Sequence, residues 1–294
     1  RGPNPTQEQP LLHAGQDENR YLYFTPNGYF NTPEFVITRD GNQNEQRLRA
    51  TSSLPSDQWV HLAVTLHGES GRIYVNGVEQ VTHLYINGAQ QPNETITINP
   101  QEVAGVESWL GRSIFNNGDG TFDGFSGKLD QVVIYQRALS GDEVRLLAAT
   151  QMAGVQAGSR AFTPLWSVER SVVASPHFAR GWPGQTLYLP LDEGTNPMSI
   201  TTTYRNLAAE NAVGATCTSA QCPEADGRSP AGSAVHFDGQ DDFITLPPQV
   251  KESDDFTFAA CVYWRGGGSW QRIFDFGQDT SQYLFLTPSD AGGK

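Results

Sequence analysis

The sequence is poor in cysteine and in positive charge, and it has no long hydrophobic run. Its 294 residues include three cysteines, and 19 lysines and arginines stand against 32 aspartates and glutamates, for a formal net charge of −13. Nucleic acids and anionic membrane surfaces bind cationic patches, so this balance argues against both as partners. No apolar segment is long enough to cross a bilayer, so we expect no membrane span.

Turn-forming and β-forming residues are abundant: the chain has 30 glycines, 18 prolines and 11% aromatic residues. Apolar and polar residues alternate over short segments, separated by glycine, asparagine or proline, at residues 20–25, 35–38, 59–65 and 72–75. Asn76-Gly77 predicts a two-residue hairpin turn, because both central positions of a type I′ turn need positive φ. The pattern predicts an all-β protein with many short strands.

A single helix is expected, after the last strand of the first half of the chain. Ser140 and Glu143 have the spacing of a capping box. Val144, Leu146 and Leu147 supply an apolar face that extends to about Ala149. The alternation is then lost over residues 151–185, which we interpret as a connector, and strand-like segments begin again near residue 187.

Several motifs on both sides of the connector resemble one family, the laminin-G-like jelly rolls of the concanavalin-A-like lectin and glucanase group. Residues 59–65, 71–77 and 125–140 are similar to the C-terminal half of such a unit, and residues 189–194, 234–246 and 256–264 to its N-terminal half. The resemblance implies a jelly-roll β-sandwich. It predicts the C-terminal part of one unit at 1–150, the connector at 151–185 and the N-terminal part of a second unit at 186–294.

The two predicted halves overlap in sequence. Residues 15–26 (GQDENRYLYFTP) match residues 277–288 (GQDTSQYLFLTP), an offset of 277 − 15 = 262 residues. The chain therefore reads as a piece of a tandem array that starts inside one unit and stops inside the next.

A half sandwich exposes an apolar face and open strand edges, so each half needs a complement. The complement could be an adjacent repeat, the other half of the same chain, or a neighbouring chain. Closure within the chain would leave the duplicated strands surplus, which argues against it. We therefore expect head-to-tail completion by adjacent repeats or other copies, and such contacts propagate into filaments.

The resemblance also implies a structural calcium ion, held by carboxylates near the first and last strands of a unit. Carried over by motif, these are Asp192 or Glu193 and, from the last strand, Asp130. Asp119 and Asp123, in the loop 116–123, offer further oxygen ligands, although a plain turn explains that loop as well.

Two other kinds of site are expected. Trp264 and Trp270 bracket a glycine-rich loop and are candidates for stacking against sugar rings, although a structural role in the core or at its edge is the favoured explanation of both. Cys217 and Cys222 lie five positions apart in a small-residue loop and predict a disulfide, whereas Cys261 lies in an apolar run and is expected in the core. No second C-x-x-C motif accompanies them, which argues against zinc.

Catalytic motifs are missing from the sequence. The adjacent carboxylates Asp192-Glu193 and Asp241-Asp242 would point to opposite faces of a strand, unlike the paired carboxylates of retaining glycosidases. No nucleophile elbow, H-E-x-x-H motif or phosphate-binding loop is present. We therefore expect a non-enzymatic, extracellular or cell-surface protein that forms repetitive structures or filaments for adhesion. The alternative is a carbohydrate-binding module of a secreted polysaccharide-degrading enzyme.

Overall fold

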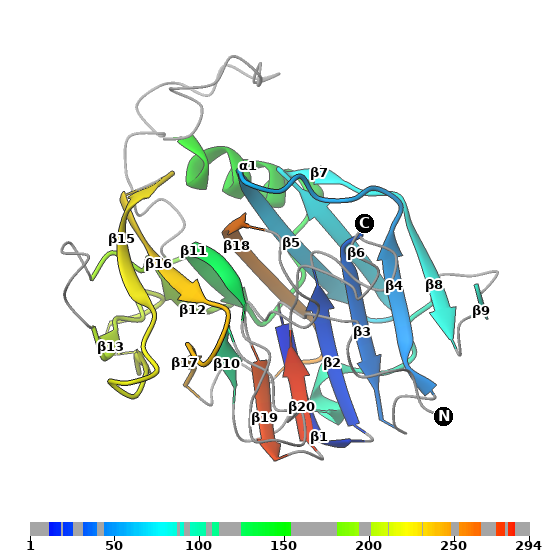
Figure 1. The fold of residues 1–294 in the computed structure, drawn as a ribbon. Coiled ribbons are helices and arrows are strands. Elements are labelled where there is room, and N and C mark those ends of the chain that lie inside the picture. The colour runs from blue at the N-terminus through cyan, green and yellow to red at the C-terminus, as the bar shows by residue number, and fades with distance from the viewer. Residues whose placement is uncertain are drawn as a thin grey trace.

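The computed structural model describes most of the strands of this chain (Figure 1). The described residues are 12–18, 20–25, 32–39, 44–86, 89–90, 95–103, 108–111, 125–153, 181–193, 201–210, 212–230, 232–247, 253–265, 275–279 and 282–285.

Two mostly antiparallel sheets face each other and confirm the expected β-sandwich. The eight-stranded sheet runs in the order β15-β16-β11-β18-β5-β6-β7, with β12 also paired to β11. Its strands are β5 (Trp59–His67), β6 (Ser70–Val75), β7 (Val78–Glu79), β11 (Ser126–Tyr135), β12 (Gln185–Leu189), β15 (Glu224–Ser229), β16 (Gly232–Asp238) and β18 (Phe256–Trp264).

The twelve-stranded sheet runs in the order β13-β14-β17-β10-β19-β20-β1-β2-β3-β4-β8-β9. Its strands are β1 (Leu12–Glu18), β2 (Arg20–Thr25), β3 (Glu34–Thr38), β4 (Gln46–Ala50), β8 (Thr82–Ile86), β9 (Ala89–Gln90), β10 (Trp109–Leu110), β13 (Thr203–Tyr204), β14 (Ala215–Thr216), β17 (Ile244–Thr245), β19 (Asp275–Asp279) and β20 (Gln282–Phe285). A short 3₁₀ helix, η2 (Pro100–Glu102), lies between β9 and β10.

The main core lies between the two sheets. Leu62 and Val64 of β5 are fully buried there, as are Phe35 and Ile37 of β3 from the facing sheet. These residues alternate along their strands because successive side chains of a strand point to opposite faces. Each buried aliphatic or aromatic side chain stabilises the fold by roughly 1.5–3 kcal/mol relative to an exposed one. The predicted turn at Asn76-Gly77 is confirmed, with φ of 51° and 76° between β6 and β7.

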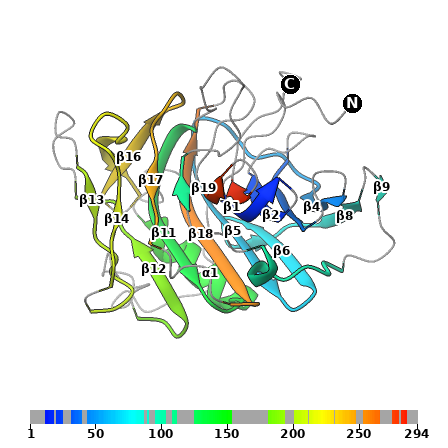
Figure 2. The same ribbon diagram turned by 90° about the horizontal axis from the view of Figure 1, so that it is seen from below.

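The two halves of the chain close on each other, which corrects the expectation that neighbouring units or chains complete them. Strand β18, from the second half, lies between β5 and β11 of the first half (Figures 1 and 2). It pairs with β5 without interruption from Phe256↔Leu66 to Tyr263↔Trp59. Closure within the chain therefore satisfies the strand edges and the apolar faces that each half would expose alone.

The surplus strands, which had argued against closure, are accommodated by a wider sheet. The repeated segments form two hairpins, β1–β2 and β19–β20, and both lie in the twelve-stranded sheet between β10 and β3. The sequence argument was wrong at this point, because a sheet can admit an additional hairpin wherever its strands offer unpaired backbone groups.

The helix α1 (Gly141–Gln151) packs on the face of the eight-stranded sheet that points away from the main core. Its predicted capping box is confirmed: Ser140 accepts a hydrogen bond from the Glu143 backbone N–H, and the Glu143 carboxylate accepts one from the Ser140 N–H. Leu147 is fully buried against this face, whereas Leu146, which sequence reasoning placed on the same apolar side, is half-buried. Within the described residues, no helix is long and apolar enough to cross a membrane.

Candidate functional sites on the outer face of the eight-stranded sheet

The face of the eight-stranded sheet that carries α1, called the outer face below, presents two rows of chemically active side chains. Directly opposed residues of neighbouring strands lie on the same face of a sheet. One row, called the surface row, crosses five strands at Trp59, Tyr263, Lys128, His236 and Glu224. All five side chains are half-buried or exposed.

The surface row is held together by direct contacts. The rings of Trp59 and Tyr263 meet edge to face, with 5.7 Å between their centroids and an interplanar angle of 67°. The Lys128 ammonium lies 5.3 Å from the centroid of the Tyr263 ring and forms a 2.6 Å ion pair with Asp226. Because both edge-to-face packing and the cation–π contact restrict the Tyr263 ring, the aromatic end of the row is ordered before any ligand arrives.

His236 continues the row beside Lys128. Its Nε2 lies 3.2 Å from a guanidinium nitrogen of Arg265. Partial burial lowers the pKa of His236 below 6.5, the cations Arg265 and Lys128 lower it further, and Glu224 opposes them. His236 is therefore mostly neutral at pH 7, and its imidazole can both donate and accept hydrogen bonds.

The second row, called the buried row, lies two residues further along the same strands. His61, Cys261 and Asp130 are directly opposed on β5, β18 and β11, and each is fully buried. The C-terminal end of α1 covers them: the Cys261 sulfur lies 3.5 Å from the sulfur of Met152 and 3.7 Å from the Gln151 carbonyl oxygen.

Burial disfavours the charged form of every group in the buried row. It lowers the pKa of His61 to about 4, partly opposed by the Gln151 side chain. It raises the pKa of the Cys261 thiol and of the Asp130 carboxyl well above their ordinary values. The row therefore holds a neutral imidazole and a thiol at pH 7, which gives His61 and Cys261 the character of core residues.

Asp130, one of the expected calcium ligands, is fully buried. Its Oδ2 is buried and has no hydrogen-bond partner among the described residues. The charge of Asp192 raises the pKa of Asp130 further, so the two carboxyls lie near each other, while hydrogen bonds from Ser229 and Gln131 oppose the shift. The chain thus brings together Asp130 and Asp192, which sequence reasoning had assigned to two different units.

This pair fits a hard cation. The described residues contain no group of three or more histidine, cysteine, aspartate or glutamate side chains arranged to hold a metal. Two carboxylates and an unpartnered carboxylate oxygen nevertheless suit Ca²⁺, which completes its coordination with carbonyl, hydroxyl and water oxygens. Asp192 is fixed from the other side, because its Oδ1 accepts a 2.8 Å hydrogen bond from the Ser233 backbone.

The other expected calcium ligands either have other hydrogen-bond partners or lie outside the residues that the structure describes. Glu193 Oε1 accepts a 2.8 Å hydrogen bond from the Arg205 backbone N–H. Burial raises the pKa of Tyr204 in the main core, and the charge of Glu193 raises it further. The other carboxylate oxygen of Glu193, Oε2, is buried and has no hydrogen-bond partner among the described residues. Asp119 and Asp123 lie outside the described residues.

Of the two tryptophans proposed for sugar binding, Trp264 is among the described residues, and it does not lie on the outer face of the sheet. Trp264 is half-buried and packs against the main core, and Trp270 lies outside the described residues. Alternation along β18 turns Tyr263 to the outer face and Trp264 toward the main core, so the two rings lie on opposite sides of the sheet.

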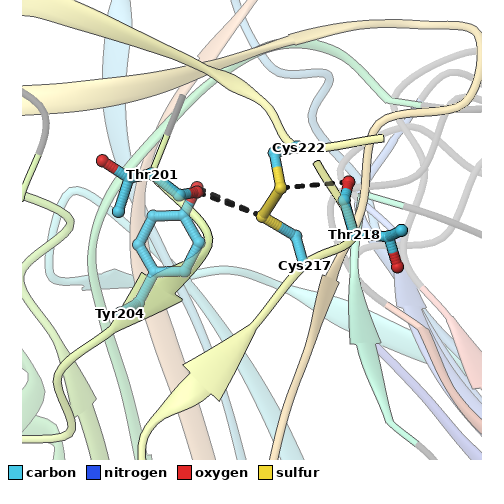
Figure 3. Close-up of a disulfide and its surroundings, with 5 residues drawn as sticks. All are labelled: Thr201, Tyr204, Cys217, Thr218 and Cys222. Carbon is cyan, nitrogen blue, oxygen red and sulfur yellow. Dashed lines mark hydrogen bonds between the residues drawn. A yellow bond between two sulfur atoms is a disulfide. The ribbon is translucent and has the colours of Figure 1, made fainter. Parts of the chain in front are cut away.

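The disulfide is confirmed. Cys217 and Cys222 are bonded, with 5.2 Å between their Cα atoms. Figure 3 shows the bridge beside Tyr204, with the Cys217 sulfur 3.2 Å from the Thr201 carbonyl oxygen and the Cys222 sulfur 3.1 Å from that of Thr218. Disulfides persist in oxidising compartments, which supports an extracellular location. Cys261 is free and buried, as expected.

A hollow of about 430 Å³ lies beside the N-terminal end of α1. Its charged side chains are already paired: Arg72 contacts Glu79 at 2.5 Å, and Glu143 accepts hydrogen bonds from Arg137. The arrangement favours a structural role for these charges over a ligand site.

Sequence reasoning missed the surface row entirely. It gave no binding role to Trp59, Tyr263, Lys128 or His236. These residues are far apart in the chain, and only the pairing of β5, β18, β11 and β16 places them side by side. The local signal that was available is the parity of Trp59 relative to Val60 and Leu62, which fill the core.

The profile of one protein family matches the chain. It is described as the concanavalin A-like lectin/glucanases superfamily, and it matches residues 2–83 and 79–145, together just under half of the chain. No curated protein and no solved structure matches. Residues 2–145 thus match this laminin-G-like family, and the sandwich described above has the fold that the family implies. Domains of this family are typically extracellular and serve adhesion or carbohydrate binding.

Proposed function

We propose that this protein is a non-catalytic extracellular adhesion protein that binds neutral polysaccharide chains through the surface row. The observation that carries the proposal is the ordered contact of Trp59, Tyr263 and Lys128 on a part of the outer face where they are only half-buried. The family supports adhesion or carbohydrate binding in general. The surface row supplies a location and a chemistry for it.

The row offers the two kinds of contact that a sugar ring needs. The aromatic end presents apolar surface for the C–H face of a ring, and Lys128, His236 and Glu224 present donors and acceptors for hydroxyl groups. Neighbouring strands lie about 4.8 Å apart, so the row places a side chain at nearly the spacing of successive hexose units in an extended chain. An oligosaccharide that crosses the strands would meet one residue of the row with each unit.

The charges around the row favour a neutral ligand. Lys128 is paired with Asp226, and the cation Arg265 lies beside His236 with the anion Glu224 nearby. Two cations therefore face two anions, and an acidic or a basic polymer would gain little net attraction.

We also propose a binding role, with no catalysis, for the carboxylates of this face. Glu224 and Asp226 lie two positions apart on β15, as one face of a strand requires, but the ion pair with Lys128 occupies Asp226. Glycoside hydrolysis needs one carboxyl free to donate a proton and a second free to attack or to activate water. Incubation with a bound polysaccharide should release no reducing ends, and their steady release would contradict the proposal.

Calcium is proposed as a structural ion of the fold. Asp130 and Asp192 would hold it, with the unpartnered Oδ2 of Asp130 as the central ligand. The ion would supply positive charge that offsets the two nearby carboxylates. It would thereby fix the end of β12 to β11, strands that come from the two halves of the chain.

Binding of the whole chain to immobilised neutral polysaccharides tests the proposed function. Affinity electrophoresis through gels that contain neutral glucans, mannans or galactans should retard the wild-type protein in at least one gel. The Lys128→Ala variant should be retarded less, whereas Arg145→Ala, an exposed cation on α1, should behave as the wild type. Retardation only in gels that contain acidic polymers would contradict the neutral-ligand proposal.

A further inference from the structure

The molecule contains the same hairpin twice, in structure as well as in sequence. Residues 15–26 and 277–288 are identical at seven of twelve positions, namely Gly, Gln, Asp, Tyr, Leu, Thr and Pro. The pairing repeats with the same offset of 262: His13↔Tyr23 corresponds to Asp275↔Phe285, and Asp17↔Arg20 to Asp279↔Gln282. Even the irregularity recurs, between Gly15 and Asp17 in one hairpin and between Gly277 and Asp279 in the other.

Each hairpin uses only one of its two equivalent outer edges on the rest of the sheet. β19, the equivalent of β1, pairs with β10 at Trp109↔Asp275. β2, the equivalent of β20, pairs with β3 over five residues from Tyr21↔Thr38 to Thr25↔Glu34. Because the strands are equivalent, either hairpin alone carries both the edge that fits β10 and the edge that fits β3.

The junction between the two hairpins has fewer ladder pairs than β2 makes with β1 or with β3. β20 pairs with β1 at Leu12↔Phe285, His13↔Leu284 and Glu18↔Gln282, with a register shift between His13 and Glu18. It also makes a single parallel pair with β2, at Arg20↔Gln282. β19–β20 is therefore held by few ladder positions, one on β10 and four on the β1–β2 hairpin.

We propose that the β19–β20 hairpin exchanges between copies of this chain and links them head to tail. A copy that donates its hairpin keeps a continuous sheet, because β1–β2 can bridge β10 and β3 in its place. A copy that has donated can accept the hairpin of another copy between β10 and β1, with the pairs of the closed chain. The partner is a second copy, and the contact is heterologous, so it propagates unless a ring closes.

This inference is independent of polysaccharide binding, because the surface row lies on the other sheet. It also differs from completion of half sandwiches, since β5, β11 and β18 stay paired within each chain. The duplicated strands, surplus in a closed molecule, thus acquire a function as a connector between molecules.

Engineered cysteines at opposed ladder positions distinguish the closed chain from chains that have exchanged the β19–β20 hairpin. His13 and Leu284 are directly opposed across the junction of β1 and β20. Opposed antiparallel residues have Cα atoms about 4.5–5.5 Å apart, a distance that a disulfide spans. The H13C/L284C double variant of the full chain, oxidised with glutathione at high protein concentration, reports exchange as disulfides between chains.

The matched control is S126C/D238C, an opposed pair of β11 and β16 that joins the two halves outside the exchanged hairpin. We expect H13C/L284C to give a ladder of covalent dimers and larger multiples on non-reducing gels, and S126C/D238C to give monomers only. A closed monomer as the sole H13C/L284C product would overturn the proposal. Multiples with S126C/D238C would overturn it as well, in favour of exchange of whole halves.

Light scattering of the unmodified wild-type chain tests the proposal even if the cysteine variants do not fold. Exchange predicts that the mean mass rises above 32.2 kDa with increasing protein concentration and returns slowly after dilution, because strand exchange requires ladder pairs to open. A constant mass of one chain at every concentration would contradict exchange, whatever the variants do.

Discussion

The surface row and the buried row lie on the same strands and the same face, two residues apart, yet they have opposite chemical characters. On β5, β18 and β11 the surface row presents Trp59, Tyr263 and Lys128, and the buried row presents His61, Cys261 and Asp130. The end of α1, through Gln151 and Met152, covers one row and leaves the other open. The position at which α1 ends therefore sets the boundary between the buried row and the surface row.

The end of α1 covers the buried row, and several polar atoms there have no hydrogen-bond partner within the part of the chain that the structure describes. His61 Nδ1 and Nε2, Gln151 Oε1 and Asp130 Oδ2 are all buried without a hydrogen-bond partner among the described residues. Such groups cost free energy unless water or an ion satisfies them. The unpartnered Oδ2 of Asp130 is the atom that the proposed calcium ion would satisfy.

The largest expected effect on the free energy of unfolding comes from weakening the packing of α1 on the outer face. Leu147 is fully buried between α1 and the outer face, so Leu147→Ala should lower the free energy of unfolding by roughly 2–5 kcal/mol. Leu146→Ala, one residue away and half-buried, should cost clearly less. Urea unfolding monitored by tryptophan fluorescence measures both. Equal losses would show that α1 does not separate the two rows as described.

Calcium should stabilise the protein through Asp130. At a calcium concentration of 100 times Kd, linkage predicts a gain of about 2.7 kcal/mol in the free energy of unfolding. Asp130→Asn should abolish this gain, and the exposed Asp142→Asn should retain it. Thermal unfolding with calcium or with a chelator measures the gain.

The same variant has a second, opposite effect in the absence of calcium. The pKa of Asp130 is raised, so calcium-free wild-type protein loses stability as the pH rises from the unfolded value of 3.8 through the raised folded value. Asp130→Asn lacks this loss and should be at least as stable as the wild type with chelator at neutral pH. A calcium response that survives in Asp130→Asn would place the ion elsewhere.

His61 should make the protein sensitive to acid. Its folded pKa of about 4 lies below the unfolded value of 6.5, so its contribution to stability is present above pH 6.5 and is lost as the pH falls toward 4. Between pH 7 and pH 5 the wild type should lose about 2 kcal/mol more than His61→Gln. Urea unfolding at the two pH values gives this difference. A variant that loses as much as the wild type would mean that water reaches His61.

Local features of the fold could be predicted from the sequence. The capping box at Ser140, the Asn76-Gly77 turn and the alternation in β5 each depend on neighbouring residues, and the structure has all three. The disulfide between Cys217 and Cys222 is local as well.

Features that depend on distant pairing could not be predicted. The choice between closure and completion by neighbours depends on whether β18 finds β5 in the same chain, and the residue pattern of either strand fits both outcomes. The surface row has the same origin, because Trp59 and Tyr263 become neighbours only through that pairing. The proximity of Asp130 and Asp192 follows from closure too, through the pairing of β11 with β12.

The central claim is that the surface row binds sugar and the buried row does not. The variant with the smallest expected change in free energy tests this claim most directly. Isothermal titration calorimetry should use an oligosaccharide of the polysaccharide that retards the wild-type protein. Trp59→Ala should bind it with about tenfold weaker affinity than the wild type, a loss of roughly 1.4 kcal/mol in binding free energy. Trp182→Ala is the control, since this half-buried ring packs on Tyr135 and is not part of the surface row. Unchanged affinity in Trp59→Ala, with binding lost in Trp182→Ala, would contradict the account.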